Sequence, residues 1–135
     1  MLKVSSCFAV QAKAGEGSRM EAAHNVELMR LLDFYGAMLT DRQHEMLRLR
    51  LEEDLSLSEI AEGFGVSRQA VNDALRKAEK TLTEMEQKLR LVEKYRALHR
   101  MAGQAARALD GGDAAGARRI LEKMLKEGVR SEERR

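Results

Sequence analysis

Residues 67–80 carry the side chains of this chain that are best suited to contact nucleic acid. The amides of Gln69 and Asn72 can hydrogen-bond to adenine edges, and the guanidinium groups of Arg68 and Arg76 can pair with guanine. Taken singly, each arginine or lysine here is more typical of a solvated helix face. The candidate residues for binding DNA or RNA are Ser67, Arg68, Gln69, Asn72, Asp73, Arg76, Lys77 and Lys80.

Charge limits the strength of such binding. Lys77 and Lys80 are suited to meet phosphates, and Arg42 could do the same from the preceding segment. Asp73 opposes binding, because a carboxylate repels phosphate and is useful only opposite the amino group of cytosine. Residues 40–80 hold seven basic and nine acidic side chains, a net charge of −2, although the whole chain has a net charge of +2. The stretch therefore combines the residue types of a DNA reader with the charge of a weak one.

No grouping of residues indicates catalysis or a metal site. His24, His44 and His99 occur singly, without a second ligand at helical or turn spacing. Cys7 has no neighbouring base in the sequence, and the acidic run 52–54 is typical of a solvated loop. The phosphate-binding pattern G-x-x-x-x-G-K-[ST] is absent. We therefore expect a protein that is not an enzyme and that uses no cofactor and no metal.

The composition predicts an all-α protein. Among 135 residues there is no proline and only 4% are aromatic, whereas Leu, Ala, Met, Glu, Lys and Arg are abundant. No apolar run approaches the ~20 residues of a membrane-spanning helix, so membrane insertion is not expected. The single cysteine excludes an intramolecular disulfide and fits a reducing, cytoplasmic location. Residues 1–23 are expected to form a disordered leader, with Met20 as an alternative start to Met1.

Two helices are expected before the helix-turn-helix pair that contains the candidate site. The first has apolar residues at helical spacing in 28–39, with Asn25 as its N-cap. The second begins at a capping box, in which Thr40 is followed three residues later by Gln43. The acidic residues at its end disfavour further helix, so we expect a break at about 53–55.

The next two helices are expected to form a tight hairpin. Ser56 and Glu59 form a second capping box at the start of the third helix. Gly65 can adopt the positive φ that closes a helix, and Ser67 is a suitable N-cap for the fourth helix. Helices that cross closely need a small residue in the first, such as Ala61, and a branched apolar residue in the second, such as Val71. These offsets predict a helix-turn-helix, whose second helix lies in the major groove of DNA.

The chain from residue 82 to about 101 contains no helix breaker, so a long helix is expected. Apolar residues of this helix recur at heptad-like spacing over about two repeats, which is typical of a seam where helices pack together. This seam predicts either a homodimer contact or packing within the chain, and the sequence does not decide between them. Its residues are Leu82, Met85, Leu89 and Val92, and a second row that drifts round the helix is Leu91, Tyr95, Leu98 and Ala102.

A final helix is expected after the turn "DGGD" at 110–113, with Asp113 as its cap. Its apolar residues are Ala117, Ile120, Leu121, Met124 and Leu125. Residues 129–135 are expected to fray.

Four stretches of the chain form a recognisable set: "LLDFYG" at 31–36, "LT" at 39–40, "LSLSEIAEGFGVSRQAV" at 55–71 and "EK" at 79–80. On these stretches, residues 28 to about 95 resemble the YlxM family of bacterial helix-turn-helix proteins. Members are similar in fold to region 4 of sigma factors, and their genes are associated with those of the signal recognition particle. The resemblance implies a regulatory role, with the signal recognition particle pathway of protein targeting as its setting.

These observations predict an all-α protein of the sigma region 4-like, winged-helix-like DNA-binding class, with a long following helix and a C-terminal helical extension. The predicted organisation is a leader (1–23), a helix-turn-helix domain (24–82), a helical extension suited to dimerisation (83–128) and a frayed tail (129–135). We expect regulatory binding of DNA or RNA through residues 67–80. The alternative is an adaptor that binds a component of the signal recognition particle without reading bases.

Overall fold

The computed structural model describes residues 16–133 of the chain. This range contains six α-helices and one 3₁₀ helix, and it contains no strand. The helices divide into two compact units, of which the first ends at Leu89 and the second begins at Arg90. The predicted all-α class is confirmed.

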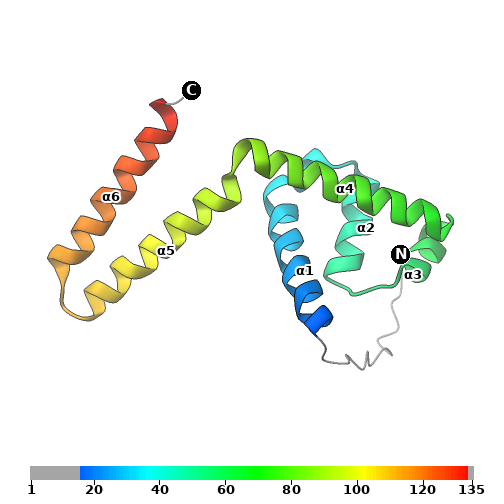
Figure 1. The fold of residues 1–135 in the computed structure, drawn as a ribbon, viewed down its shortest axis with the longest axis horizontal. Helices are drawn as coiled ribbons and strands as arrows, with labels where there is room; N and C mark the ends of the chain where they lie inside the picture. The colour runs from blue at the N-terminus through cyan, green and yellow to red at the C-terminus, as the bar shows by residue number, and fades with distance from the viewer. Residues whose placement is uncertain (1–15, 134–135) are drawn as a thin grey trace. The chain divides into compact units, whose positions relative to one another are not determined.

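The first unit consists of a 22-residue helix and the shorter segments that precede it. The helix α4 contacts each of the three α-helices before it (Figure 1). The elements of the unit are α1 (Glu16–Tyr35), η1 (Gly36–Met38), α2 (Asp41–Leu51), α3 (Leu57–Phe64) and α4 (Arg68–Leu89).

Both predicted capping boxes are present. The Thr40 hydroxyl accepts a hydrogen bond from the Gln43 N–H at 3.1 Å, and the Gln43 side chain accepts one from the Thr40 N–H at 3.2 Å. Ser56 and Glu59 make the same pair of bonds, at 3.1 and 2.8 Å. Each box satisfies backbone donors that the first turn of a helix leaves unpaired, so α2 and α3 begin at defined residues.

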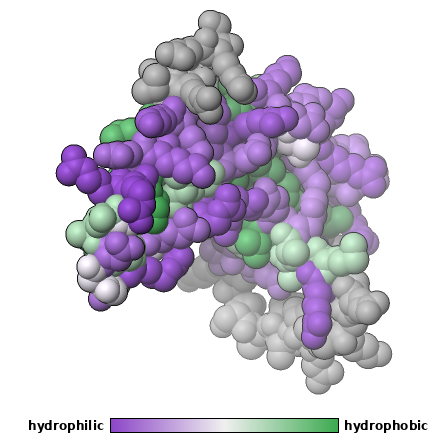
Figure 2. All heavy atoms as spheres, turned by 60° about the vertical axis from the view of Figure 1, so that its left-hand side comes forward, coloured by the Kyte–Doolittle hydropathy of each residue, from purple (hydrophilic) through white to green (hydrophobic). Residues whose placement is uncertain are grey.

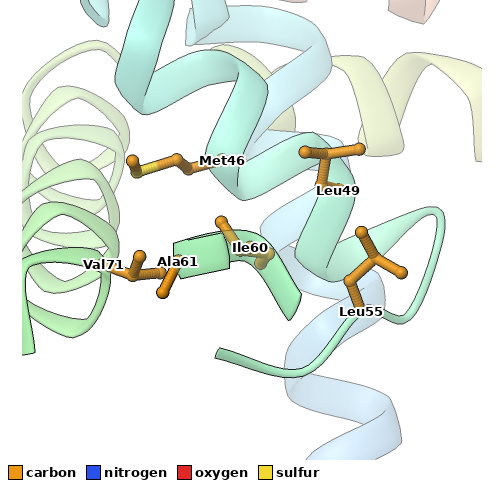
Figure 3. Packing of buried hydrophobic residues seen from close by; sticks show 6 residues of the cluster. All are labelled: Met46, Leu49, Leu55, Ile60, Ala61 and Val71. Carbon is orange, nitrogen blue, oxygen red and sulfur yellow. The ribbon is translucent and has the colours of Figure 1, made fainter. Parts of the chain in front are cut away.

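An apolar cluster joins α2, α3 and α4. Its buried members come from each of these helices and from the loop before α3 (Figure 3). Ile60 and Val71 are fully buried, which fixes one face of α3 and one face of α4 against α2. The cluster consists of Met46, Leu49, Leu55, Ile60, Ala61 and Val71.

Polar contacts hold α1 against α4. The Tyr35 hydroxyl donates a hydrogen bond to Glu86 Oε1 at 2.6 Å, and His24 Nε2 lies 2.9 Å from Glu79 Oε1. Where α1 ends, Gly36 packs so closely on the His44 ring that a Cβ would lie 2.9 Å from ring atoms. The helices α1, α2 and α3 all contact α4, whose buried residues lie on one face, and the residues of the opposite face are exposed.

The second unit is a hairpin of α5 (Leu91–Asp110) and α6 (Ala114–Glu133), which lie side by side (Figure 1). Gly112 adopts a positive φ of 79° in the connecting turn. Asp113 Oδ1 accepts a hydrogen bond from the Gly116 N–H at 2.8 Å, which confirms the predicted cap of the last helix.

The structure differs from the sequence-based expectations at both ends of the described range. The helix α1 begins at Glu16, so residues 16–23 of the predicted leader are helical and Asn25 lies inside the helix. At the other end, α6 continues to Glu133, so the predicted fraying from residue 129 is not found up to that residue. The rest of the leader, including Cys7, and residues 134–135 lie outside the described range.

The predicted long helix is interrupted. The helix α4 ends at Leu89, Arg90 adopts a left-handed conformation with φ 52°, and α5 begins at Leu91. The sequence contains neither glycine nor proline at this point, so no local signal marks the break. The first compact unit consequently extends beyond the boundary predicted at residue 82.

Candidate nucleic-acid interface

The turn between α3 and α4 has the geometry that its sequence predicts. Gly65 is left-handed, with φ 65° and ψ 34°, and its N–H bonds back to the carbonyl of Glu62 at 3.3 Å. The Val66 N–H bonds to the carbonyl of Ala61 at 3.0 Å, which completes the end of α3. The Ser67 hydroxyl then accepts a hydrogen bond from the Ala70 N–H at 3.0 Å, so Ser67 caps α4.

Small and branched residues let the two helices cross closely, as predicted. Ala61 of α3 and Val71 of α4 belong to the same buried cluster, and α3 and α4 contact each other (Figure 3). The small side chain on one helix and the branched one on the other leave room for a close approach. The hairpin therefore fixes the direction in which α4 leaves the turn.

The helix α4 has one buried face and one exposed face. Val71, Ala78 and Leu82 are fully buried, and their spacing places them on one side of the helix. The predicted binding residues lie outside this stripe: Asn72 is half-buried, and Ser67, Arg68, Gln69, Asp73, Arg76, Lys77 and Lys80 are exposed.

The exposed face combines a hydrogen-bonded amide with exposed cations. Gln69 Nε2 donates a hydrogen bond to Asp73 Oδ1 at 3.1 Å, so the carboxylate that opposes phosphate binding is held by a neighbour one turn away. Sequence reasoning did not predict this pair, although its i, i+4 spacing is the signal that could have revealed it. Lys80 lies 4.0 Å from Glu84, which is a weak pair between exposed groups.

Three cations of the predicted binding site have no acidic partner among the residues that the structure describes. Within residues 16–133, no carboxylate pairs with Arg68, Arg76 or Lys77. The first turn of α4 contains no acidic side chain either, so the positive end of the helix dipole is not neutralised there. These features favour an anionic ligand near the start of α4.

Three of the nine acidic side chains of residues 40–80 pair with a single arginine of the same stretch. Arg48 pairs with Glu45 at 2.9 Å, with Glu53 at 3.3 Å and with Glu52 at 3.5 Å. The hydrogen bond from the Arg48 guanidinium lowers the pKa of the Glu45 carboxyl below its usual value. The same bond raises the pKa of Arg48, so this group stays fully charged.

Two of these carboxylates, Glu52 and Glu53, lie at the far end of α2 from the turn. The Arg42 guanidinium, near the start of α2, is 5.8 Å from the centre of the Phe64 ring at the end of α3. Glu52 and Glu53 follow the other end of this 11-residue helix, which is about 16 Å long. That length exceeds a Debye length of about 8 Å at physiological salt, so these carboxylates weaken the field near the turn only slightly.

The predicted dimer seam is not one continuous stripe. Leu82 is fully buried inside the first unit, and Met85 is half-buried. Leu89 is 38% exposed at the end of α4, whereas Val92 lies beyond the left-handed Arg90 and is buried. A heptad register cannot pass through this break unchanged, because it requires uninterrupted helix.

The three histidines have separate surroundings. His24 pairs with Glu79, His44 lies under Gly36, and His99 contacts the Tyr95 ring at 5.7 Å between centres. In the part of the chain that the structure describes, no three His, Cys, Asp or Glu side chains form a group that could hold a metal ion. Over the same residues, no helix has the length and apolarity needed to cross a membrane.

A comparison with protein families identifies the class of this chain. Residues 22–113 match the model of the family described as "Putative helix-turn-helix protein, YlxM / p13 like". The chain belongs to this family. The match is wider than the resemblance predicted from residues 28 to 95, since it begins within α1 and ends at the turn before α6.

Individual relatives support the same assignment. A UPF0122 protein of Desulforamulus reducens is 43% identical over 104 residues, which cover 77% of this chain and 87% of the relative. One from Symbiobacterium thermophilum is 46% identical over 91 residues, which cover 67% and 85%. One from Latilactobacillus sakei is 50% identical over 76 residues, which cover 56% and 67%.

Proposed function

We propose that this member of the YlxM / p13-like family is a regulatory protein that binds DNA through the exposed face of α4. The observation that carries the proposal is that α4 has one buried apolar face and one exposed face with cations that are unpaired among the described residues. Val71, Ala78 and Leu82 anchor one face in the core of the first unit. The other face presents Arg68, Arg76 and Lys77, which pair with no carboxylate of the described residues. Such a helix, placed after a tight turn, has the form of a recognition helix.

The chemistry of the exposed face suits both parts of DNA recognition. Arginine can make a bidentate hydrogen bond to the edge of guanine, and the amides of Gln69 and Asn72 can hydrogen-bond to the edge of adenine. Lys77 and Lys80 are suited to phosphates, whose contacts position a protein without specifying sequence. By the resemblance to the YlxM family, we propose that the protein acts in the signal recognition particle pathway, in the cytoplasm.

A second candidate function is supported by charge. The net charge of −2 over residues 40–80, and Asp73 within the exposed face itself, are unfavourable for a polyanion. The alternative is therefore an adaptor that presents the same helix to a protein component of the targeting pathway. The two functions differ in how their affinity depends on salt.

The test is to measure binding to a pool of double-stranded DNA of random sequence, and then to the sequences that the protein enriches from it. For a DNA reader, the logarithm of affinity falls linearly with the logarithm of salt concentration, with a slope of about −0.9 for each phosphate neutralised. Arg68→Ala and Arg76→Ala should each weaken binding by roughly 1–3 kcal/mol and relax base preference. Lys77→Glu and Lys80→Glu should weaken binding to all sequences alike.

The matched control is Arg30→Ala, which removes an exposed cation of the same unit from α1 instead of α4. It should leave the affinity close to that of the unchanged protein. If the four α4 variants bind as well as the Arg30 variant, α4 is not the recognition helix. Affinity for a targeting component that barely changes with salt, together with no DNA binding, would favour the adaptor.

A further inference from the structure

Small residues are buried in both helices of the second unit, and several larger apolar residues of these helices are exposed. Ala105 of α5 and Ala117 of α6 are buried between the helices. In contrast, Leu109 is 58% exposed and Leu125 is 72% exposed. Figure 2 shows that hydrophobic residues reach the surface on the face drawn there, among hydrophilic ones. The exposed large apolar residues of the hairpin are Leu91, Tyr95, Leu98, Leu109, Leu121 and Leu125.

These residues lie on one side of the hairpin. Successive residues of an α-helix are rotated by about 100°, so the exposed row of α5 is turned by about 20–80° from Ala105, which faces α6. Leu121 and Leu125 are turned from Ala117 by about 40° and 80° in the same rotational sense. Since α5 and α6 are antiparallel neighbours joined by a short turn, equal rotation places both rows on the same side of the pair. We call this side the hairpin face.

The two apolar rows contain no charged side chain, and the reverse side of the hairpin is polar. Arg118 is turned by about 100° from Ala117 in the same sense, so it borders the row of α6, where it pairs with Glu122 at 3.3 Å. Between Leu91 and Leu109 the row also includes Ala102 and Ala105, in a spacing of four, three, four, three and four residues. Turned the other way from the helix contact are Arg100 and Gln104 of α5, and Lys123 and Glu127 of α6. The two helices together thus have one apolar side and one polar side, so the hairpin as a whole is amphipathic.

We propose that the hairpin face binds the hairpin face of a second copy of this chain, so that α5 and α6 of both copies form a four-helix bundle. The alternation of four and three residues is the spacing with which helices pack in such bundles. In a contact between two copies related by a two-fold axis, the same residues line both surfaces, so a surface with charges of one sign would meet charges of the same sign. The two rows avoid this conflict because they are uncharged, and Arg118 beside them is paired with Glu122.

The size of the face fits a dimer contact. The row from Leu91 to Leu109 is about 27 Å long, and two adjacent helices are together about 20 Å wide. The projected area of the face is therefore more than about 500 Å², and the ridges and grooves of the side chains add to it. This is of the order of the ~800 Å² that each partner contributes to a stable interface. The proposal concerns assembly alone, and it replaces the seam of Leu82, Met85, Leu89 and Val92, which Arg90 interrupts.

The experiment is to measure the mass of the full chain in solution, without nucleic acid, by light scattering at low and high protein concentration. We expect a dimer whose mass falls to half in Leu98→Asp and in Leu121→Asp. Gln104→Asp is the matched control, because it adds the same carboxylate to the reverse side of α5, and it should remain dimeric. Leu89→Asp should also remain dimeric, whereas a dimer resting on the earlier seam would dissociate.

Circular dichroism must show that each aspartate variant keeps its helix content. Because aspartate could unfold the hairpin, a second measurement uses the alanine variants Leu98→Ala and Leu121→Ala, which should raise the dissociation constant without loss of helix. An unchanged chain that is monomeric at every concentration overturns the proposal. So does a dimer that withstands both aspartate variants, or one that Leu89→Asp or Gln104→Asp breaks equally well. None of these outcomes depends on whether α4 binds DNA.

Discussion

The chain contains two helical hairpins that are built in opposite ways. In the α3–α4 hairpin, the large branched residues Ile60 and Val71 are buried and the outer face is polar. In the α5–α6 hairpin, Ala105 and Ala117 are buried at the helix contact and leucines are exposed. The first hairpin is stabilised by the core of its own unit, which leaves its polar face available to a ligand. The second has apolar surface that is not used within the unit, and this makes it suited to association.

The largest difference should come from truncating a large apolar residue in each hairpin. Ile60→Ala should lower the free energy of unfolding of the first unit by about 2–5 kcal/mol, since it opens a cavity in the cluster of Figure 3. Leu109→Ala should cost less than about 1 kcal/mol at low protein concentration, because little of this side chain is buried.

Chemical denaturation at two protein concentrations measures both effects. For Leu109→Ala we expect the cost to grow at high concentration, where the second copy covers the residue. For Ile60→Ala the cost should not depend on concentration. Equal costs for the two variants at low concentration would contradict the comparison between the hairpins.

The turn glycines of the two hairpins offer a matched pair of smaller effects. Gly65 and Gly112 both have positive φ, and a Cβ on either would meet no atom within 4 Å. Alanine at each position should therefore cost only the strain of a left-handed backbone, about 1–2 kcal/mol. Gly103→Ala, inside α5, is the control with the opposite effect on stability. Alanine favours helix over glycine, so this variant should raise the free energy of unfolding of the hairpin by roughly 1 kcal/mol.

Hydrogen exchange of the amides of α4 and of α6 reports the two turn variants separately. Faster exchange should be confined to the hairpin that carries the substitution. A loss of protection in both units from one substitution would show that the units do not open independently.

The N-caps after these turns provide the next pair. Ser67→Ala removes the acceptor of the Ala70 N–H, and Asp113→Ala removes that of the Gly116 N–H. Each should cost about 1 kcal/mol, within the range of about 0.5–2 kcal/mol for helix caps, and the aspartate should cost more because its charge also interacts with the helix dipole. Hydrogen exchange of the amides in the first turn of α4 and of α6 measures the loss of stability. Equal protection of these amides in both variants and in the parent would show that Ser67 and Asp113 do not act as caps.

The smallest effect is expected at the ion pairs. The pKa of Glu45 is lower in the folded chain than its usual value of 4.5, because Arg48 donates a hydrogen bond to it. The stabilisation is therefore present above pH 4.5 and is lost as the pH falls through the lowered pKa of the folded state. Both groups are partly exposed, so Glu45→Gln should cost less than about 1 kcal/mol at neutral pH.

The cost of Glu45→Gln should disappear in acid, where the parent carboxyl is protonated as well. Denaturation curves at neutral and acidic pH give this difference directly. The matched variant is Glu122→Gln in the second unit, which removes an exposed i, i+4 pair with Arg118 and should have a smaller effect at neutral pH. A cost for Glu45→Gln that persists unchanged in acid would contradict the role of Arg48.

The parts of the fold that depend on neighbours in the sequence could be predicted. The caps at Thr40, Ser56, Ser67 and Asp113, and the left-handed Gly65, all involve bonds between residues three or four apart. Such bonds have residue preferences that a sequence displays directly.

Features that depend on distant residues could not be predicted. Tyr35 and Glu86 are 51 positions apart, and nothing in either neighbourhood indicates their hydrogen bond. The break at Arg90 has no glycine or proline to mark it, and the surrounding apolar pattern is compatible with continuous helix. In the candidate site, the exposed and buried faces of α4 followed from helical spacing, whereas the separation of Glu52 and Glu53 from the turn required the fold.

The measurement that tests DNA binding by α4 most directly is a crosslinked pull-down of the protein from native cells, divided into nuclease-treated and untreated halves. We predict that DNA is recovered, that its crosslinks map to residues 67–80, and that nuclease removes it. Recovery of protein partners alone, unaffected by nuclease and without crosslinks from 67–80 to nucleic acid, would contradict the proposed function and would assign the exposed face of α4 to a protein contact.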